Sequence, residues 1–151
     1  MSSVIATYNG DADELCGCEA IIVPCIDFCF HKPSQDAIER SLKIPVCVVR
    51  SEPGVSLTFA QRGSRLDALM ADIESTVNAH HASKVILVDH SDCGAYKMAG
   101  MSFADVGIEE GKHEENLKLA KKVIHEKFPN VEVITLYAKK QGGKIELIEL
   151  H

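Results

Sequence analysis

Four consecutive apolar residues, Val85 to Val88, constrain the fold more than any other stretch of this chain. The run is rich in β-branched side chains and much too short to span a membrane, which predicts a buried strand. Similar runs occur at 20–24 and 45–50, and segments with a helical spacing of apolar residues lie between the runs. Short strands that alternate with helices predict a mostly parallel α/β sheet flanked by helices.

Apolar residues that recur at spacings of three and four predict the helices. The clearest stripe has acidic residues on the opposite face and consists of Leu66, Leu69, Met70, Ile73 and Val77. Ser34 is the expected N-cap of the first helix, because its hydroxyl can accept a hydrogen bond from a backbone amide of the first turn. The predicted helices span residues 34–42, 64–81 and 113–128.

The C-terminal segment predicts a β-hairpin at one edge of the sheet. Residues 131–137 are apolar enough for a strand, and two glycines at 142–143 favour a turn. Residues 144–150 then alternate apolar and charged side chains, as in a strand that is buried on one face. Strands joined by so short a turn are antiparallel, so the sheet is expected to carry an antiparallel C-terminal edge strand.

The length of 151 residues, without internal repeats or a linker, predicts one domain over 1–151. Within it, residues 1–18 are expected to form a peripheral segment, with at most a short edge strand at 4–8. Residues 51–63 contain proline and glycine and are expected to form a loop. The glycine- and methionine-containing stretch at 94–111 predicts neither helix nor strand.

Charge and composition exclude several classes of function. The net charge of −6 argues against a general binder of nucleic acid or anionic membranes. No apolar run exceeds about five residues, which excludes a transmembrane helix. The N-terminus lacks the basic and then long apolar segments of a secretory signal, so a cytoplasmic location is expected. In that reducing compartment, six cysteines suggest metal binding or redox chemistry rather than disulfides.

Soft metal ligands stand at the ends of two predicted parallel strands. Cys25 follows the first strand, and His90 and Cys93 follow the third. Parallel strands bring their C-terminal ends to one edge of a sheet, so these three side chains can converge. Two thiolates and an imidazole suit Zn²⁺, whose catalytic sites often keep three protein ligands and one open position. Asp27 could accept a hydrogen bond from zinc-bound water or become the fourth ligand itself.

Each of these residues alone has a simpler explanation. A cysteine at the end of a buried strand is often a small apolar filler, and a histidine there is often a hydrogen-bonded structural residue. The combination is far more specific, because Cys-x-Asp follows one core strand and His-x-x-Cys-Gly follows another.

Three short segments resemble the motifs of the β-class carbonic anhydrases, in the order in which that family has them. They are Cys25-Ile-Asp27, Arg50-Ser-Glu-Pro-Gly54 and His90-Ser-Asp-Cys-Gly-Ala95, and the resemblance covers the chain from about Glu19. It implies that Cys25, His90 and Cys93 are zinc ligands and that Asp27 is the catalytic aspartate. Arg50 and Gly54 match the ends of the family's Arg-Asn-Ala-Gly loop, and with Gly94 they are candidates for the substrate pocket.

The same resemblance implies a reaction and an assembly. The expected activity is that of a zinc lyase, in which a metal-bound hydroxide attacks CO2 and gives bicarbonate. A closely similar small substrate, such as a carbon–sulfur analogue, is also compatible. In the family the site lies at a dimer interface, which implies at least a homodimer for this chain.

Two departures from the family's pattern leave alternatives open. Cys29 stands where the family's first motif, Cys-x-Asp-x-Arg, has an arginine that pairs with the aspartate and holds it off the metal. Without that cation Asp27 is freer to close the zinc site, which would give a zinc-binding relative without CO2 hydration, in a binding or regulatory role. The arginine loop also has five residues instead of four. Arg50, Arg62 and Arg65 lie in or just after it and are the arginines that could reach in.

The remaining cysteines and histidines carry weaker hypotheses. A second zinc site from Cys16, Cys18, Cys29 and His31 does not match a common spacing, and a free Cys29 near the metal is the expectation. A thiol-redox pair of Cys25 and Cys29 is a third functional hypothesis, although the spacing is unusual for it. Cys47 is expected to be core filler. The histidines that could pass protons to buffer, but are expected to be ordinary surface residues, are His31, His80, His81 and His113.

Overall fold

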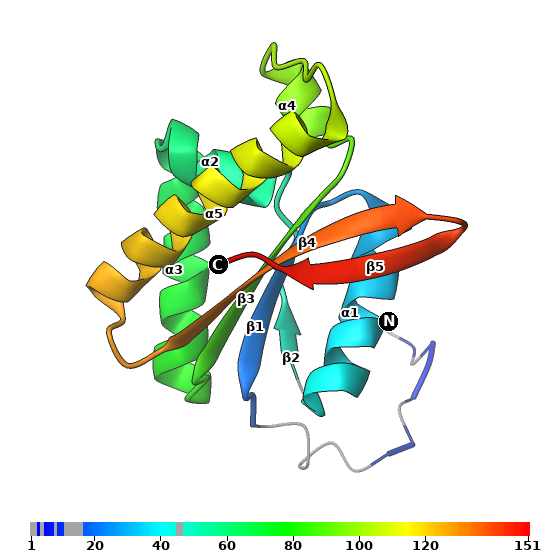
Figure 1. Ribbon diagram of the computed structural model, residues 1–151. Helices are drawn as coiled ribbons and strands as arrows, with labels where there is room; N and C mark the ends of the chain where they lie inside the picture. Colours follow the sequence, from blue (N-terminus) through cyan, green and yellow to red (C-terminus); the bar gives the residue numbers. More distant parts are fainter. Residues whose placement is uncertain (1–2, 4, 8, 11–16, 45–46) are drawn as a thin grey trace.

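The computed structural model describes residues 3, 5–7, 9–10, 17–44 and 47–151. They form the predicted α/β architecture, whose five-stranded sheet has the order β2-β1-β3-β4-β5 (Figure 1). The first four strands are mutually parallel, and β5 runs antiparallel to β4. The strands are β1 (Ala20–Pro24), β2 (Cys47–Val49), β3 (Lys84–His90), β4 (Glu132–Gln141) and β5 (Lys144–Glu149).

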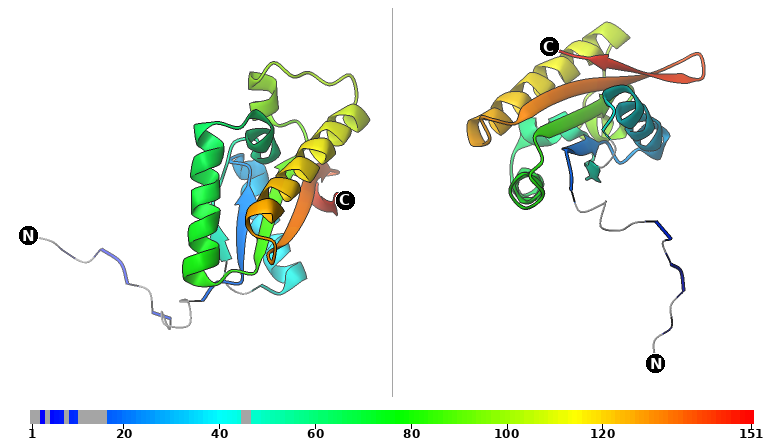
Figure 2. Two further views of the ribbon diagram at one scale, coloured as in Figure 1. Left: turned by 90° about the vertical axis from the view of Figure 1, so that its left-hand side faces the viewer. Right: turned by 90° about the horizontal axis from the view of Figure 1, so that it is seen from below.

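Helices cover both faces of the sheet. They are α1 (Phe28–Leu42), α2 (Val55–Gln61), α3 (Ser64–His80), α4 (Gly94–Met98) and α5 (Val106–Lys127). Figure 2 shows α3 and α5 on one side of the sheet and α1 on the other. Alternate residues of β3 point to the two sides: Leu87 packs in the core beneath α3 and α5, and Ile86 packs in the core beneath α1. Because both faces are buried, the central strands are continuously apolar.

The first helix begins six residues before the predicted N-cap Ser34. Asp27 is the N-cap, and Pro33 and the buried Ser34 both lie inside the helix. The Pro-Ser pair resembles a helix start, but the capping hydrogen bond is made by Asp27, at the end of the segment that leaves β1. This correction matters for function, because it attaches the helix directly to the segment that carries Cys25.

The predicted loop at 51–63 is also wrong, because it contains α2, whose residues Val55 to Phe59 are buried. The stretch 94–111 contains α4 and the start of α5. Helix α5 begins at Val106 rather than at residue 113, capped by Asp105, whose carboxylate accepts a hydrogen bond from the Ile108 amide at 2.9 Å. Two glycines in its first turns hide this helix from a periodicity argument.

Smaller differences concern the ends of elements. The N-cap of α3 is Gly63, so Ser64 is its first helical residue. Residues 5–7 of the expected edge strand at 4–8 are not in a strand, and residues 4 and 8 lie outside the described part of the chain. Residues 45–46 of the second predicted strand also lie outside it. No helix of the described residues is long and apolar enough to cross a membrane.

Candidate metal centre

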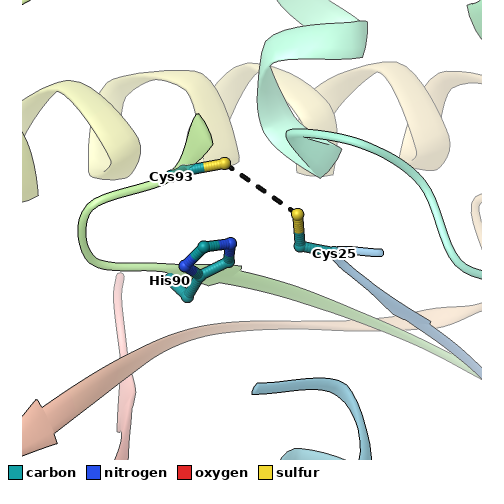
Figure 3. A group of neighbouring side chains, drawn as sticks. All are labelled: Cys25, His90 and Cys93. Carbon is teal, nitrogen blue, oxygen red and sulfur yellow. Dashed lines mark hydrogen bonds between the residues drawn. The ribbon is translucent and has the colours of Figure 1, made fainter. Parts of the chain in front are cut away.

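Cys25, His90 and Cys93 meet at the C-terminal edge of the sheet. Cys25 follows β1, His90 is the last residue of β3, and Cys93 is the N-cap of α4. Strands β1 and β3 are parallel neighbours, so their ends lie together. The possible ligand atoms of the three buried residues lie within 4.8 Å of one another, and Figure 3 shows the side chains pointing toward a common point. This convergence was predicted from the sequence.

The spacing of the two sulfur atoms fits a shared metal ion. Cys25 Sγ and Cys93 Sγ are 3.9 Å apart (Figure 3). Two thiolates at about 2.3 Å from a tetrahedral Zn²⁺ are about 3.8 Å apart. A disulfide would require a separation of about 2.05 Å, and both cysteines are free.

The imidazole of His90 is oriented as a metal ligand would be. Its Nδ1 lies 2.8 Å from the carbonyl oxygen of Ser91, to which it donates when Nδ1 carries the proton. The Phe30 ring stacks on the imidazole, with centroids 4.3 Å apart and an angle of 21° between the planes. Nε2 is buried and has no hydrogen-bond partner among the residues that the structure describes. A buried nitrogen lone pair without a partner is costly unless a cation occupies the position that it faces.

The protonation of the site favours a cation as well. A hydrogen bond from Cys93 lowers the pKa of Cys25 to about 4, although burial alone would raise it. The same hydrogen bond, with burial, raises the pKa of Cys93 far above its usual range. Burial lowers the pKa of His90, but the neighbouring Cys25 thiolate outweighs burial and the net direction is upward. The pair of thiols therefore loses its first proton more easily than an isolated cysteine and its second proton less easily.

A cavity of about 380 Å3 opens beside this group. Cys25, His90, Gly94 and the half-buried Asp27 are among its lining residues. Asp27 thus shares the cavity with Cys25 and His90, but its carboxylate is not within 4.8 Å of all three ligand atoms. Its Oδ1 accepts a hydrogen bond from the backbone amide of Cys29 at 3.0 Å.

Gly54, which the sequence predicted to be a pocket residue, also lies beside the candidate metal ligands. Its backbone amide is directed at Cys25 and contributes to the low pKa of that thiol. Gly54 has φ +56°, and a Cβ there would lie 2.8 Å from the Cβ of Ala95. Both facts require glycine, because the backbone must approach the start of α4 closely.

Arg50, in contrast, is not among the residues that line the cavity. It donates through Nε to Asp72 at 3.0 Å and pairs through Nη1 with the buried Glu52. Arg65 also pairs with Glu52, at 2.8 Å. Arg50 and Arg65, two of the arginines that could replace the motif arginine that this chain lacks, therefore pair with other carboxylates. No ion pair to Asp27 occurs in the described part of the chain.

The other cysteines form no second metal group among the described residues. Cys29 is a free, exposed thiol, and Cys18 donates to the carbonyl oxygen of Ala20 at 2.8 Å. Cys29 is not among the residues that line the cavity, so its expected position near the metal stays a prediction. Cys16, and the side chain of Cys47, lie outside what the structure describes.

One sequence expectation about the histidines is wrong. His80 and His81 are exposed and His31 is partly buried, but His113 is fully buried. Its Nδ1 lies 2.6 Å from Oδ2 of the buried Asp89, one residue before His90. His113 belongs to a buried network of hydrogen bonds, which we call the Asp89 network. Its members are Ser56, Asp89, Tyr96, His113 and Asn116. The available signal was an aspartate at the end of an apolar strand.

The fold and the buried Cys-His-Cys group define an α/β protein with a site that could hold a metal ion. A family model described as "Putative carbonic anhydrase" matches residues 17–149, so the chain belongs to that family. A relative from Rickettsia bellii (strain RML369-C) is 29% identical over 136 residues, which cover 87% of this chain and 82% of the relative. That relative is itself named only "Uncharacterized protein".

Proposed function

We propose that the protein hydrates CO2 to bicarbonate with a zinc ion held by Cys25, His90 and Cys93. The observation that carries the proposal is the buried His90 Nε2, which has no hydrogen-bond partner in the described part of the chain. It lies beside a cavity, together with two sulfurs at the spacing of a tetrahedral site. Bound there, zinc would supply the Lewis acidity that makes water nucleophilic near neutral pH. Family membership supports the same reaction.

The residues around the cavity suit this chemistry. The Asp27 carboxylate can accept a proton or hydrogen bond from the attacking water, because it lines the same cavity as the ligands. Ile26, Ala95 and Met98 make another part of the wall apolar, which suits a substrate without charge or dipole. The amide of Gly54 stabilises negative charge on Cys25 and so keeps that ligand ionised.

A zinc-binding protein without CO2 hydration is the second candidate. The motivating observation is that no arginine pairs with Asp27 among the described residues, so that Asp27 could become the fourth ligand. X-ray absorption on the zinc protein distinguishes the two candidates. Three protein ligands and one water oxygen support hydration, whereas four protein ligands support the second candidate.

The proposal includes a homodimer in which a second copy covers the mouth of the cavity. Phe28, Met98 and Ile26 line the cavity and are 83%, 90% and 56% exposed. Such a group of exposed large apolar side chains is typical of an interaction surface. The resemblance to β-class carbonic anhydrases favours a second copy as its partner.

Stopped-flow measurement of CO2 hydration tests the activity. The zinc-loaded protein should exceed the rate of an equal concentration of free zinc by several orders of magnitude. Cys25→Ser should lose zinc and activity together. Cys29→Ser is the matched control, because it makes the same atomic change at an exposed cysteine and keeps the backbone amide. A wild-type rate equal to that of free zinc contradicts the proposal.

A further inference from the structure

We propose that the N-terminus of α1 holds Asp27 off the metal position, through the backbone amide of Cys29, and so keeps the fourth position open. The inference rests on the metal centre of the proposed function but not on its substrate. It assigns a positioning role to a backbone group at the residue where the resembled family has an arginine side chain.

Asp27 is fixed as the N-cap by its side chain and its backbone together. Its carboxylate accepts the Cys29 amide at 3.0 Å, and its carbonyl oxygen accepts the amides of Phe30 at 3.0 Å and His31 at 2.9 Å. Its φ of −60° and ψ of 107° are the extended values of an N-cap. The side-chain rotamer is therefore determined by the start of the helix.

The electrostatics at this point also favour the capped position. The N-terminus of a helix carries a partial positive charge, and α1 is 15 residues long. No acidic residue occurs in the first turn of α1, so no second carboxylate competes with Asp27 for its amides. The helix thus supplies the positive charge that a guanidinium would otherwise bring.

Capping and coordination are alternatives for the Asp27 carboxylate. In the capped position the carboxylate lies outside the 4.8 Å group of ligand atoms, although it lines the same cavity. To bind the metal the carboxylate would have to move inward, away from the position in which its Oδ1 accepts the Cys29 amide. The strength of one capping hydrogen bond therefore sets how often the fourth position is open to a small molecule.

Cys29→Pro tests this directly, because proline removes the amide and is tolerated in the first turn of a helix. Cys29→Ala is the matched control, because it removes the same thiol but keeps the backbone amide that bonds to the Asp27 carboxylate. Cys29→Ser controls for loss of the thiol. Each protein is loaded with Co²⁺, and its visible spectrum is titrated with azide, an anion that binds an open metal position.

The wild type and both controls should change their spectra at similar azide concentrations. Cys29→Pro should require at least about fivefold more azide, the factor that a typical N-cap hydrogen bond contributes. The double variant Asp27→Ser/Cys29→Pro should recover the wild-type response, because it has no carboxylate that can close the site. That recovery would not occur if Cys29→Pro merely disturbed the fold.

Equal azide responses in the wild type and Cys29→Pro would overturn the inference. So would X-ray absorption data that show Asp27 bound to cobalt in the wild type. Failure to bind cobalt would refute the metal centre and the inference with it. CO2 hydration is measured on the same variants after zinc loading. A wild type that binds azide in the predicted way but does not hydrate CO2 refutes only the proposed function and supports the role of α1.

Discussion

At the scale of single residues, one proton shared between Cys25 and Cys93 determines how the centre responds to pH. The pKa of Cys25 is lowered to about 4 and that of Cys93 is raised. A metal ion must displace the proton on Cys93 to bind both sulfurs, whereas Cys25 is already ionised. Metal binding therefore requires the loss of one thiol proton instead of two.

We expect zinc affinity to rise with pH, with two slopes. Above about pH 4 Cys25 contributes no proton, whereas Cys93, with its raised pKa, loses one on binding, so affinity should rise about tenfold per pH unit. The pKa of His90 is also raised, and at pH values below that pKa zinc must displace a second proton, from the imidazole. The rise in zinc affinity with pH should therefore be steeper on the acidic side. Competition with a chromophoric chelator across the neutral range measures both slopes. An affinity independent of pH would contradict this account.

At the scale of elements, the Asp89 network attaches the end of β3 to three helices. The Asp89 carboxylate accepts the Ser56 amide of α2 at 3.0 Å, the Ser56 hydroxyl and His113 of α5. The Tyr96 hydroxyl, from α4, lies 2.8 Å from the Ser56 hydroxyl and accepts from Asn116 of α5. Because His90 follows Asp89 directly and Cys93 comes three residues after His90, the same bonds help to fix the turn that carries two of the three candidate ligands.

His113→Leu should lower the free energy of unfolding of the metal-free protein by about 3 kcal/mol. The substitution leaves the buried Asp89 carboxylate without one of its donors, which is among the costlier single changes. His125→Leu, at an exposed position of the same helix, should change stability by less than about 0.5 kcal/mol. Urea denaturation of both variants makes the comparison. Equal effects would show that Asp89 does not depend on His113.

The elements also show what the sequence could and could not predict. The meeting of Cys25 with His90 and Cys93 was predictable, because apolar strands and the parallel arrangement place their ends together. The start of α1 was not predictable, since Pro33-Ser34 is a local helix-start signal. The role of Asp27 as the N-cap becomes clear only from its hydrogen bond with the Cys29 amide. His113 was assigned to the surface because its partner, Asp89, is distant in sequence and becomes a neighbour only when α5 packs on the sheet.

At the scale of the whole molecule, the candidate ligands join segments that the unfolded chain keeps apart. Cys25 and His90 come from different strands, so their metal site forms only when β1 and β3 are paired. A metal that binds only the folded state stabilises that state by mass action.

Zinc should therefore raise the melting temperature. At 100 times its Kd, zinc adds about 2.7 kcal/mol, which corresponds to about 5–10 °C for a domain of this size. Magnesium, which prefers oxygen ligands, should have no effect, and a chelator should reverse the shift. Differential scanning calorimetry of the wild type and Cys25→Ser measures the increase. An equal increase in Cys25→Ser would show that zinc binds elsewhere.

The proposed dimer makes a separate prediction for the mouth of the cavity. Phe28→Glu places a charge on an 83% exposed side chain, and an acidic residue in the first turn of α1 is compatible with the helix. The charge should weaken association at least about tenfold, because it would have to be desolvated between two copies.

Ile5→Glu, at a 97% exposed position that is not among the residues lining the cavity, is the control. Sedimentation velocity over a range of concentrations should give a dimer for the wild type and the control, and a monomer for Phe28→Glu at the same concentration. A wild type that is monomeric at every concentration, or a Phe28→Glu protein that associates as the wild type does, would contradict the dimer.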